Sequence, residues 1–307
     1  MTAYKELKTI RDFIRFAVSR FNEAGLFYGH GTDNAWDEAL ALVFPALHLP
    51  HHIHTTLLDA NLTKVEREKL LFLISKRINE RIPVPYLTHE SWFAGLSFYI
   101  DERVLIPRSP IAELIENHFE PWVNLDAVEN ILDLCTGSGC IAIACAKQFP
   151  HAHVDASDIS HDALSVARIN ILRHSVEDQV SLFESDLFSS LPEKKYDLIV
   201  SNPPYVNAPD MSSLPAEFLH EPQIGLMGGL SGLDIALKIL KNANPYLQDK
   251  GLLIVEVGNS ETALIELFPD VPFTWLSFER GGDGVLMLTK EQLTAYQSIF
   301  SKTSVES

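Results

Sequence analysis

The sequence predicts an α/β protein in which a mostly parallel, Rossmann-like sheet is closed by an antiparallel hairpin and preceded by a smaller helical domain. From about residue 130 onward, strand-like and helix-like runs alternate, which is typical of parallel sheets with helices on both faces. The last two strand-like runs, 273–278 and 284–288, are separated only by residues 279–283. That connection is too short for a parallel crossover, so these two strands must be antiparallel. The first eighty residues instead show helical periodicity.

Composition narrows the class of protein. The 307 residues, 46% hydrophobic and 21% charged, suit about two globular domains and exclude a disordered or collagen-like chain. A net charge of −17 disfavours duplex nucleic acid as a partner, because an acidic body repels phosphate. We expect no signal peptide and no membrane association, since no apolar run of about 18 residues occurs. Cys135, Cys140 and Cys145 form no C-x-x-C pair, which favours a reducing, cytoplasmic location over a disulfide scaffold or zinc site.

Residues 1–85 are predicted to form the helical domain. Apolar residues of the first helix recur at three- and four-residue steps: Leu7, Ile10, Ile14, Ala17 and Phe21. A second helix, capped by Asp33 or Asn34, carries an apolar face of Trp36, Leu40, Val43 and Leu47. A third begins with a capping box at Thr63–Glu66 and has an apolar face of Leu70, Leu71, Ile74 and Ile78. The intervening histidines His51, His52 and His54 are expected to be a solvated surface, so no metal site is predicted.

Residues 86–108 are predicted to form a β-hairpin that links two domains. The run 92–100 is aromatic and β-branched, residues 101–103 are the expected turn, and residues 104–106 are the expected return strand. Residues 109–307 form the larger domain. Its expected parallel strands are 131–134, 153–156, 180–183, 197–201 and 252–257, and its expected helices include 141–147, 161–172 and 233–240.

A glycine turn follows the first of these strands. Its residues, which are candidates for binding a cofactor, are Cys135, Thr136, Gly137, Ser138 and Gly139. Glycines let the backbone approach a ligand closely, and the helix that follows offers free N–H groups. Asp158 ends the next strand, where a carboxylate can accept both ribose hydroxyls of an adenosine. The same spacing also satisfies an NAD fingerprint, so this feature alone leaves methyltransferase and dehydrogenase about equally open, with a turn that binds nothing as the third alternative.

Asp186 lies just past the third strand, at the same carboxyl edge of the sheet. It can accept the exocyclic amine of an adenine while Leu187 or Phe188 packs on the ring. A solvated loop aspartate or a helix cap explains Asp186 nearly as well.

The motif Asn202-Pro203-Pro204-Tyr205 follows the strand 197–201 and decides between these functions. Its two prolines fix the backbone and remove two N–H donors. The Asn202 side-chain oxygen and the Pro203 carbonyl then remain as acceptors for the two protons of a planar NH₂ group, and Tyr205 offers a ring on which that group can stack. Such a cradle aims the nitrogen lone pair at a methyl donor through positioning alone.

Together these motifs resemble a class I S-adenosyl-L-methionine-dependent methyltransferase acting on a planar amino nitrogen. Over nearly the whole chain, the sequence resembles the HemK/PrmC-PrmB family of protein glutamine N5-methyltransferases. The family's interdomain hairpin is matched by residues 93–107, which read FAGLSFYIDERVLIP. Glu221-Pro222 and the glycine-containing segment 228–233 match its E-P…G-G-x-x-G-L pattern. The resemblance implies that S-adenosyl-L-methionine is the cofactor and that residues 202–205 are catalytic.

Within the family, the chain is most similar to the branch that modifies large-subunit ribosomal protein L-three. Release-factor enzymes read P-R-P-E-T-E after the hairpin, whereas this chain has Arg108-Ser109-Pro110 within PRSPIAE, and it also carries the turn 280–284, R-G-G-D-G. Leu187 stands where release-factor enzymes often have a tryptophan, which leaves the residue that stacks on adenine open. The implied partner is ribosomal protein L-three, with release factors as the alternative.

Charge supports the ribosomal partner, because a body at −17 attracts a basic protein over long range. The helical domain is the expected docking site. The alternative is that the acidity serves only to keep the protein soluble. A DNA amino-methyltransferase shares the Pro-Pro-aromatic chemistry but needs a basic surface to extrude a base. An NAD-dependent oxidoreductase leaves residues 202–205 unexplained, and a non-enzymatic adaptor leaves the intact glycines and Asp158 unexplained. Neither the modified glutamine nor the oligomeric state follows from the sequence.

Overall fold

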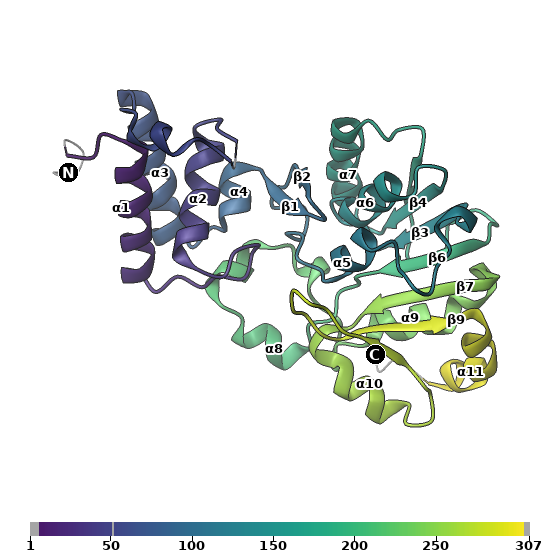
Figure 1. The fold of residues 1–307 in the computed structure, drawn as a ribbon. Helices are drawn as coiled ribbons and strands as arrows, with labels where there is room; N and C mark the ends of the chain where they lie inside the picture. Colours follow the sequence, from purple (N-terminus) through teal and green to yellow (C-terminus); the bar gives the residue numbers. More distant parts are fainter. Residues whose placement is uncertain (1–5, 51, 304–307) are drawn as a thin grey trace. The chain divides into compact units, whose positions relative to one another are not determined.

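The computed structural model describes residues 6–50 and 52–303, so the expectations for His51 and for the tail 304–307 lie outside the described residues. The chain divides into two compact units. The first contains the described residues up to Ser91 together with Ile100–Glu102 and Pro215–His220, and the rest of the described chain forms the second (Figure 1). In the described part of the chain, no helix combines the length and apolar character needed to cross a bilayer.

The first unit is helical, as predicted. Its helices are α1 (Ile10–Glu23), α2 (Ala35–Ala46), α3 (Lys64–Asn79) and α4 (Val84–Thr88), with a 3-10 helix at Thr55–Asp59. Helix α1 packs against α2 and α3, and α2 packs against α4. The predicted capping box of α3 is confirmed, because Thr63 and Glu66 satisfy each other's backbone N–H groups at 2.7 and 3.3 Å. Asn34 caps α2.

Two expectations for the first unit were wrong. Helix α1 does not include Leu7, because a capping box between Thr9 and Asp12 starts the helix at Ile10, although Leu7 is still buried. Trp36, expected on the apolar face of α2, has 54% of its surface exposed. The buried stripe of that helix includes Ala35, Ala39, Leu42 and Ala46. Helical periodicity does not explain this exposure, because the buried Val43 lies only about 20° around the helix from Trp36. Trp36 is in the first turn of the helix, where it lines a cavity of the first unit with Leu40 and Phe44.

A buried arginine organises the first unit. Arg77 is 1% exposed, and its guanidinium donates to Glu38 at 2.7 Å, to Glu217 at 3.1 Å and to the Phe27 carbonyl at 2.8 Å. Glu217 belongs to the 3-10 helix Ala216–His220 and also accepts the Phe27 N–H at 3.1 Å. A segment that follows residues 202–205 in the sequence is therefore held in the helical unit by a buried charge cluster.

The second unit is built on a seven-stranded sheet. The strands are β3 (Asn130–Leu134), β4 (His153–Asp158), β5 (Val180–Glu184), β6 (Tyr196–Ser201), β7 (Leu247–Glu256), β8 (Thr274–Leu276) and β9 (Val285–Thr289). Their order is β5-β4-β3-β6-β7-β9-β8. The first five are parallel, and β9 is antiparallel to both β7 and β8. This confirms the predicted antiparallel hairpin. The second strand of the hairpin, β9, lies between β7 and β8, so the first strand, β8, forms the edge of the sheet.

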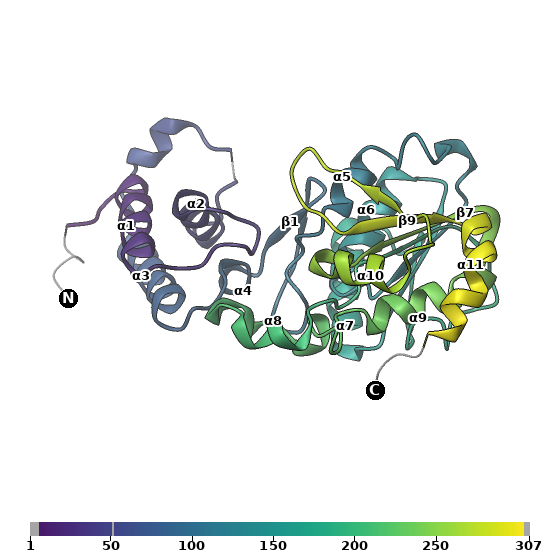
Figure 2. The ribbon, with the colours of Figure 1, turned by 90° about the horizontal axis from the view of Figure 1, so that it is seen from below.

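The second unit also contains α-helices. They are α5 (Ile111–Glu116), α6 (Cys140–Gln148), α7 (His161–His174), α8 (Ala208–Ser213), α9 (Asp234–Asn242), α10 (Glu261–Leu267) and α11 (Lys290–Lys302). Helix α6 packs against α5, α7 and the strands β3–β5. Helices α9 and α11 lie side by side, and α11 packs on β7 and β9 (Figure 2). Helices α8, α10 and α11 were not among the helices predicted from the sequence.

The predicted hairpin exists, but its turn was placed wrongly. Its strands are β1 (Ser91–Phe93) and β2 (Leu96–Phe98), so the turn is Ala94-Gly95 and not residues 101–103. Both turn residues have positive φ, +46° and +72°, as a two-residue hairpin turn requires. Residues 104–106 are not in a strand; instead, Val104 and Leu105 line a cavity of the second unit.

Replacing Arg77 by methionine should lower the free energy of unfolding by about 3–5 kcal/mol, because Glu38 and Glu217 would stay buried without their cation. The matched control is Arg20→Met, which breaks the exposed pair with Glu23 and should change the free energy by less than about 1 kcal/mol. Urea unfolding of both variants measures the difference. Equal stability of the two would contradict the structural importance of the buried cluster.

Candidate active site

The register of two neighbouring parallel strands brings the predicted site residues together. Leu134, the last residue of β3, pairs with Ser201, the last residue of β6, and the Ser201 hydroxyl donates to the Leu134 carbonyl at 2.8 Å. The glycine turn and residues 202–205 therefore leave the sheet side by side. On the other side of β3, Leu134 pairs with Ser157, one residue before Asp158. All three sequence features thus meet at one edge of the sheet.

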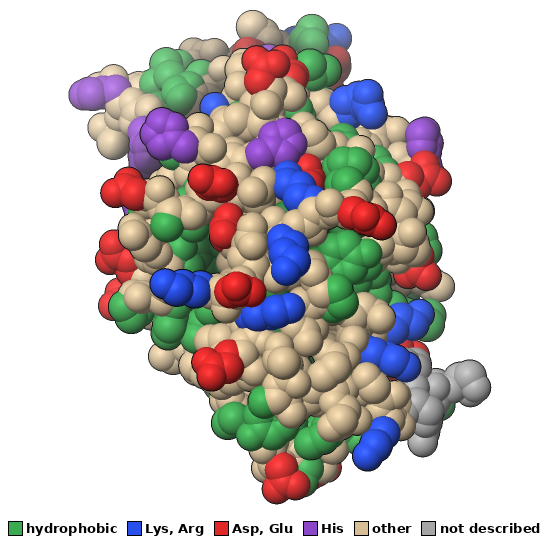
Figure 3. All heavy atoms as spheres, turned by 90° about the vertical axis from the view of Figure 1, so that its right-hand side faces the viewer, with side chains coloured by type: hydrophobic (Ala, Val, Ile, Leu, Met, Phe, Trp, Pro, Cys, Tyr) green, Lys and Arg blue, Asp and Glu red, His purple; other side chains and the backbone are tan. Residues whose placement is uncertain are grey.

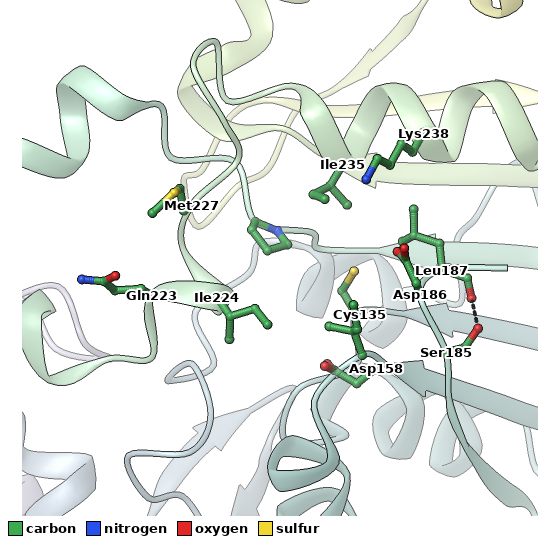
Figure 4. A pocket seen from close by; sticks show the side chains of 12 residues that line it. Cys135, Asp158, Ser185, Asp186, Leu187, Gln223, Ile224, Met227, Ile235 and Lys238 are labelled. Carbon is green, nitrogen blue, oxygen red and sulfur yellow. Dashed lines mark hydrogen bonds between the residues drawn. The ribbon is translucent and has the colours of Figure 1, made fainter. Parts of the chain in front are cut away.

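A cavity of about 480 Å³ opens at this edge. In Figure 4, Cys135 and Asp158 lie between Ile224 and Met227 on one side and Asp186 and Leu187 on the other. The remaining lining residues are Ile159, Ser185, Pro204, Gln223, Ile235 and Lys238. A smaller cavity is lined by Asn202, Gly137 and Leu105, and it shares Cys135, Asp158 and Pro204 with the larger one. The two cavities are therefore neighbouring parts of one cleft.

The two glycines of the turn have different physical roles. Gly139 starts α6 with a φ of +80°, and a β-carbon there would lie 3.2 Å from that of Ala167 on α7, so this glycine permits the close approach of two helices. Gly137 has a φ of +55°, and a β-carbon there would project into open space. That open side faces the smaller cavity. The Ser138 carbonyl is held by buried Asn170 of α7 at 2.9 Å, a contact that the sequence analysis missed.

Asp158 is positioned by backbone donors. Its two carboxylate oxygens accept the N–H groups of Gly137 and Ser160, each at 2.9 Å. Burial raises the pKa of this carboxyl, and the N–H donors partly oppose that effect. Each oxygen keeps further lone pairs, and the residue lines both cavities. This arrangement fits a ribose diol.

A second carboxylate lies beneath the turn. Asp133 is fully buried and accepts the Thr136 hydroxyl and the Ala142 N–H, at 2.5 and 3.1 Å. Burial raises the pKa of its carboxyl to about 7. Burial, together with the charges of Asp158 and Asp133, also raises the pKa of the Cys135 thiol, which keeps that thiol neutral. Cys135 is thus a small neutral side chain at the cavity wall and not a nucleophile.

Asp186 and Leu187 lie at the opposite wall of the larger cavity. Asp186 is exposed to it, and Leu187 is 9% exposed with a φ of +51°. The Ser185 hydroxyl stabilises this turn by donating to the Leu187 carbonyl at 2.8 Å. Ile235 and Lys238 of α9 lie across from them (Figure 4). A carboxylate beside apolar side chains suits the amine and ring of an adenine. Together with Asp158 and the open side of Gly137, these residues fit S-adenosyl-L-methionine.

The four residues of the motif 202–205 occupy different places. Asn202 and Pro204 line the cleft, and Pro203 is buried. Tyr205 directs its hydroxyl to Glu256, the last residue of β7, at 2.9 Å. Burial and the Glu256 charge raise the pKa of the Tyr205 hydroxyl, so it remains a donor. No local sequence pattern marks Glu256, so this carboxylate partner of Tyr205 could not be predicted from the sequence.

Glycines allow a second segment to pack against the motif. A β-carbon at Gly228 would lie 2.7 Å from the α-carbon of Tyr205, and one at Gly232 would lie 2.3 Å from the Tyr205 carbonyl oxygen. Val206 also exchanges backbone hydrogen bonds with this segment, at 2.8 Å to Leu226 and 2.9 Å from Gly228. The G-G-x-x-G-L pattern therefore has a steric reason: larger residues would push the segment away from residues 202–205.

The segment after the hairpin supplies two further contacts. Arg108 forms a two-pronged ion pair with the buried Glu221, at 2.8 and 3.1 Å, which fixes the Glu221-Pro222 pattern in place. The neighbouring Ser109 donates to Glu256, the carboxylate that binds Tyr205. Both contacts join parts of the chain that are more than a hundred residues apart.

Stability should depend on pH through Asp133. Its pKa of about 7 in the folded protein exceeds the ordinary 3.8, so the folded state holds the proton more tightly. The stabilising contribution is present below pH 3.8 and is lost as the pH rises through about 7, at up to about 1.4 kcal/mol per pH unit. Asp133→Asn should flatten this dependence. Urea unfolding between pH 4.5 and 8 measures it, and parallel curves for the two proteins would contradict the assignment.

Comparison with known proteins agrees with this geometry. Residues 114–229 match the family model "Methyltransferase small domain". The chain is 49% identical to the ribosomal protein uL3 glutamine methyltransferase of Francisella tularensis, over 96% of this chain and 95% of that protein. It is 52% identical to the protein of the same name from Neisseria gonorrhoeae, over 95% of this chain and 97% of that protein. The solved hMettl16 catalytic domain in complex with MAT2A 3'UTR hairpin 6 has the same fold, with a TM-score of 0.50 and 16% identity over 81% of this chain and 92% of that one. Sequence, fold and site agree that the protein is an S-adenosyl-L-methionine-dependent methyltransferase, and the chain belongs to the family of ribosomal protein uL3 glutamine methyltransferases.

Proposed function

We propose that this enzyme transfers a methyl group from S-adenosyl-L-methionine to the N5 amide nitrogen of a glutamine in ribosomal protein uL3. The observation that carries the proposal is that Asn202 lines the same small cavity as Gly137 and Asp158. An acceptor suited to an amide NH₂ group is thus adjacent to the residues suited to the cofactor. The names of the two relatives support uL3 as the substrate.

The chemistry is one of alignment. An amide nitrogen is a weak nucleophile because its lone pair is delocalised into the carbonyl group. The Asn202 side-chain oxygen and the Pro203 carbonyl accept the two amide protons, and Tyr205 limits the tilt of the amide plane. These contacts turn the lone pair toward the cofactor, which supplies an electrophilic methyl group on a sulfonium. The methylated nitrogen is acidic, so its extra proton can leave to water.

Cofactor binding is assigned to residues on three sides of the cleft. We assign the methionine portion of the cofactor to the turn Cys135–Gly139, the ribose hydroxyls to Asp158, and the adenine to Asp186 and Leu187. Asn202 lies where the cofactor and the amide would meet. Support comes from the free acceptor positions of Asp158 and from the open side of Gly137.

Docking of the protein substrate is assigned to residues 1–85, with residues 86–108 as the connection and residues 109–307 as the catalytic part. The cleft holds about 480 Å³, which suits the cofactor and one side chain but not a protein surface. On the face shown in Figure 3, Lys and Arg side chains are interspersed with Asp and Glu. The net charge of −17 favours a basic ribosomal protein over duplex DNA. We expect the reaction to take place in the cytoplasm, where ribosomal proteins are made.

Two variants separate alignment from cofactor binding. Asn202→Ala should lower kcat by about 100-fold and change the Kd for S-adenosyl-L-methionine by less than about twofold, since it removes only an amide acceptor. Asp158→Ala should raise that Kd by about tenfold or more, because two ribose hydrogen bonds are lost. Calorimetry gives Kd, and methyl transfer to purified uL3 gives kcat. Near-normal turnover of Asn202→Ala would refute the mechanism, and unchanged affinity of Asp158→Ala would refute the ribose assignment.

The substrate assignment predicts both a preference and a salt dependence. Purified uL3 should be methylated at one glutamine with a kcat/KM at least about tenfold above that for a release factor, a difference of about 1.4 kcal/mol. Long-range attraction also predicts that kcat/KM falls severalfold between 20 and 300 mM salt while kcat stays nearly constant. Mass spectrometry identifies the site. Faster methylation of the release factor would overturn the substrate, and a salt-independent kcat/KM would remove the steering.

A further inference from the structure

We propose that Glu256 and Ser109 are positioning residues for methyl transfer, which act by holding Tyr205 in one orientation. The inference rests on the proposed function, because it assigns Tyr205 to the target amide. Neither residue lines the cleft cavities described above, and Tyr205 does not line them either. Glu256 contacts the motif 202–205 through the Tyr205 hydroxyl, which is the route by which we expect it to act.

Both carboxylate oxygens of Glu256 and the hydroxyl of Ser109 take part in hydrogen bonds. Glu256 uses one carboxylate oxygen to accept the Tyr205 hydroxyl at 2.9 Å and the other to accept the Ser109 hydroxyl. Ser109 is itself held, because its hydroxyl oxygen accepts the Ile111 N–H at 3.2 Å. The chain of contacts thus runs from the N-terminus of α5 through the end of β7 to the catalytic motif. Every link is formed within the second unit.

Burying the polar side chains of this hydrogen-bond network costs free energy of solvation. Glu256 is 3% exposed and Ser109 is 6% exposed. Burial raises the pKa of Glu256, and the two hydroxyl donors together with the Arg108 charge oppose that effect. An apolar residue of similar volume would avoid the desolvation of a carboxylate. What distinguishes Glu256 from other buried carboxylates of the chain is that one of its two hydrogen-bond donors is a residue of the motif 202–205.

The surroundings leave the tyrosine ring little freedom. A β-carbon at Gly258 would lie 2.5 Å from the Tyr205 ring, so the ring lies flush against that glycine. The Tyr205 carbonyl accepts the Ser260 hydroxyl at 3.2 Å, and Gly232 packs against the same carbonyl. The backbone is therefore held independently of Glu256. The remaining freedom of Tyr205 is the tilt and rotation of its ring about the side-chain bonds, and the hydrogen bond from its hydroxyl to Glu256 limits this freedom. A misoriented ring lowers kcat more than it weakens binding.

The chain contains a matched control pair. Tyr196, at the amino end of β6, donates its hydroxyl to the buried Asp155 at 2.8 Å. This tyrosine–carboxylate bond has nearly the same length as the one between Tyr205 and Glu256, and both carboxylates are buried. Tyr196 is fully buried whereas Tyr205 is half-buried, and Asp155 also pairs with Lys194 at 3.0 Å. It lies at the opposite end of β6 from residues 202–205, because β6 ends at Ser201. Removing it should affect folding stability without touching the cleft.

The experiment compares Glu256→Ala, Glu256→Gln, Ser109→Ala and Tyr205→Phe with the controls Asp155→Ala and Tyr196→Phe. Each full-length protein is assayed for thermal unfolding, for S-adenosyl-L-methionine binding by calorimetry and for methyl transfer to uL3. We expect Glu256→Ala and Tyr205→Phe to lower kcat by about ten- to 100-fold and to leave the cofactor Kd within about twofold. Glu256→Gln, which keeps an acceptor for the tyrosine, should stay within about threefold of the parent. Ser109→Ala should lower kcat by about three- to tenfold.

The double variant Tyr205→Phe/Glu256→Ala decides whether the residues act together. If Glu256 acts through Tyr205, the double variant loses no more turnover than either single variant. Multiplied losses would overturn the proposal, and so would a Glu256→Ala kcat equal to that of Asp155→Ala at comparable stability. These outcomes differ from failure of the proposed function, in which the parent protein itself would not methylate uL3. In that case the same variants are tested on the substrate that mass spectrometry identifies.

Discussion

The parallel pairing of β3 with β6 is the constraint on which the site depends. Residue 134 lies opposite residue 201, so the glycine turn and residues 202–205 emerge as neighbours from the middle of the sheet. A parallel strand advances about 3.3 Å per residue, and a side-chain face is restored only by a two-residue shift. The smallest slip that kept each side chain on the same face of the sheet would separate the two loops by about 6.6 Å. The bond from Ser201 to the Leu134 carbonyl stabilises the observed register at the point where the loops diverge.

Pairing within the sheet does not hold residues 202–205 in place. Its two prolines lack N–H donors, so the motif cannot be held by a continuous strand ladder. Support comes instead from segments distant in sequence. The glycines at 228 and 232 place backbone directly against Tyr205, and the Arg108–Glu221 ion pair fixes the start of the segment that contains them. Rigidity at the site is thus a tertiary property, built from close contacts that only glycine permits.

Much of this could be predicted from the sequence because the signals were local. Strand and helix alternation, the capping box at Thr63 and the glycine turn each depend on neighbouring residues, and the structure confirms them. The hairpin turn was misplaced because Ala94-Gly95 is a weak turn signal beside Asp101-Glu102. Trp36 was assigned to the core on periodicity alone, although the facing helices decide which stripe is buried. The Arg77–Glu217 cluster, which joins residues 140 positions apart, has no local signature at all.

Ser109, which follows the hairpin, is both a residue that marks this branch of the family and a member of a buried hydrogen-bond network. In the sequence, Ser109 distinguishes this chain from the release-factor pattern, which has proline there. In the structure, its hydroxyl donates to Glu256 and accepts the Ile111 N–H. A proline has no hydroxyl, so a chain with proline at this position must satisfy the buried carboxylate in another way or replace it. The identity of residue 109 is therefore coupled to how Tyr205 is held, because a single residue, Glu256, connects Ser109 to Tyr205 by hydrogen bonds.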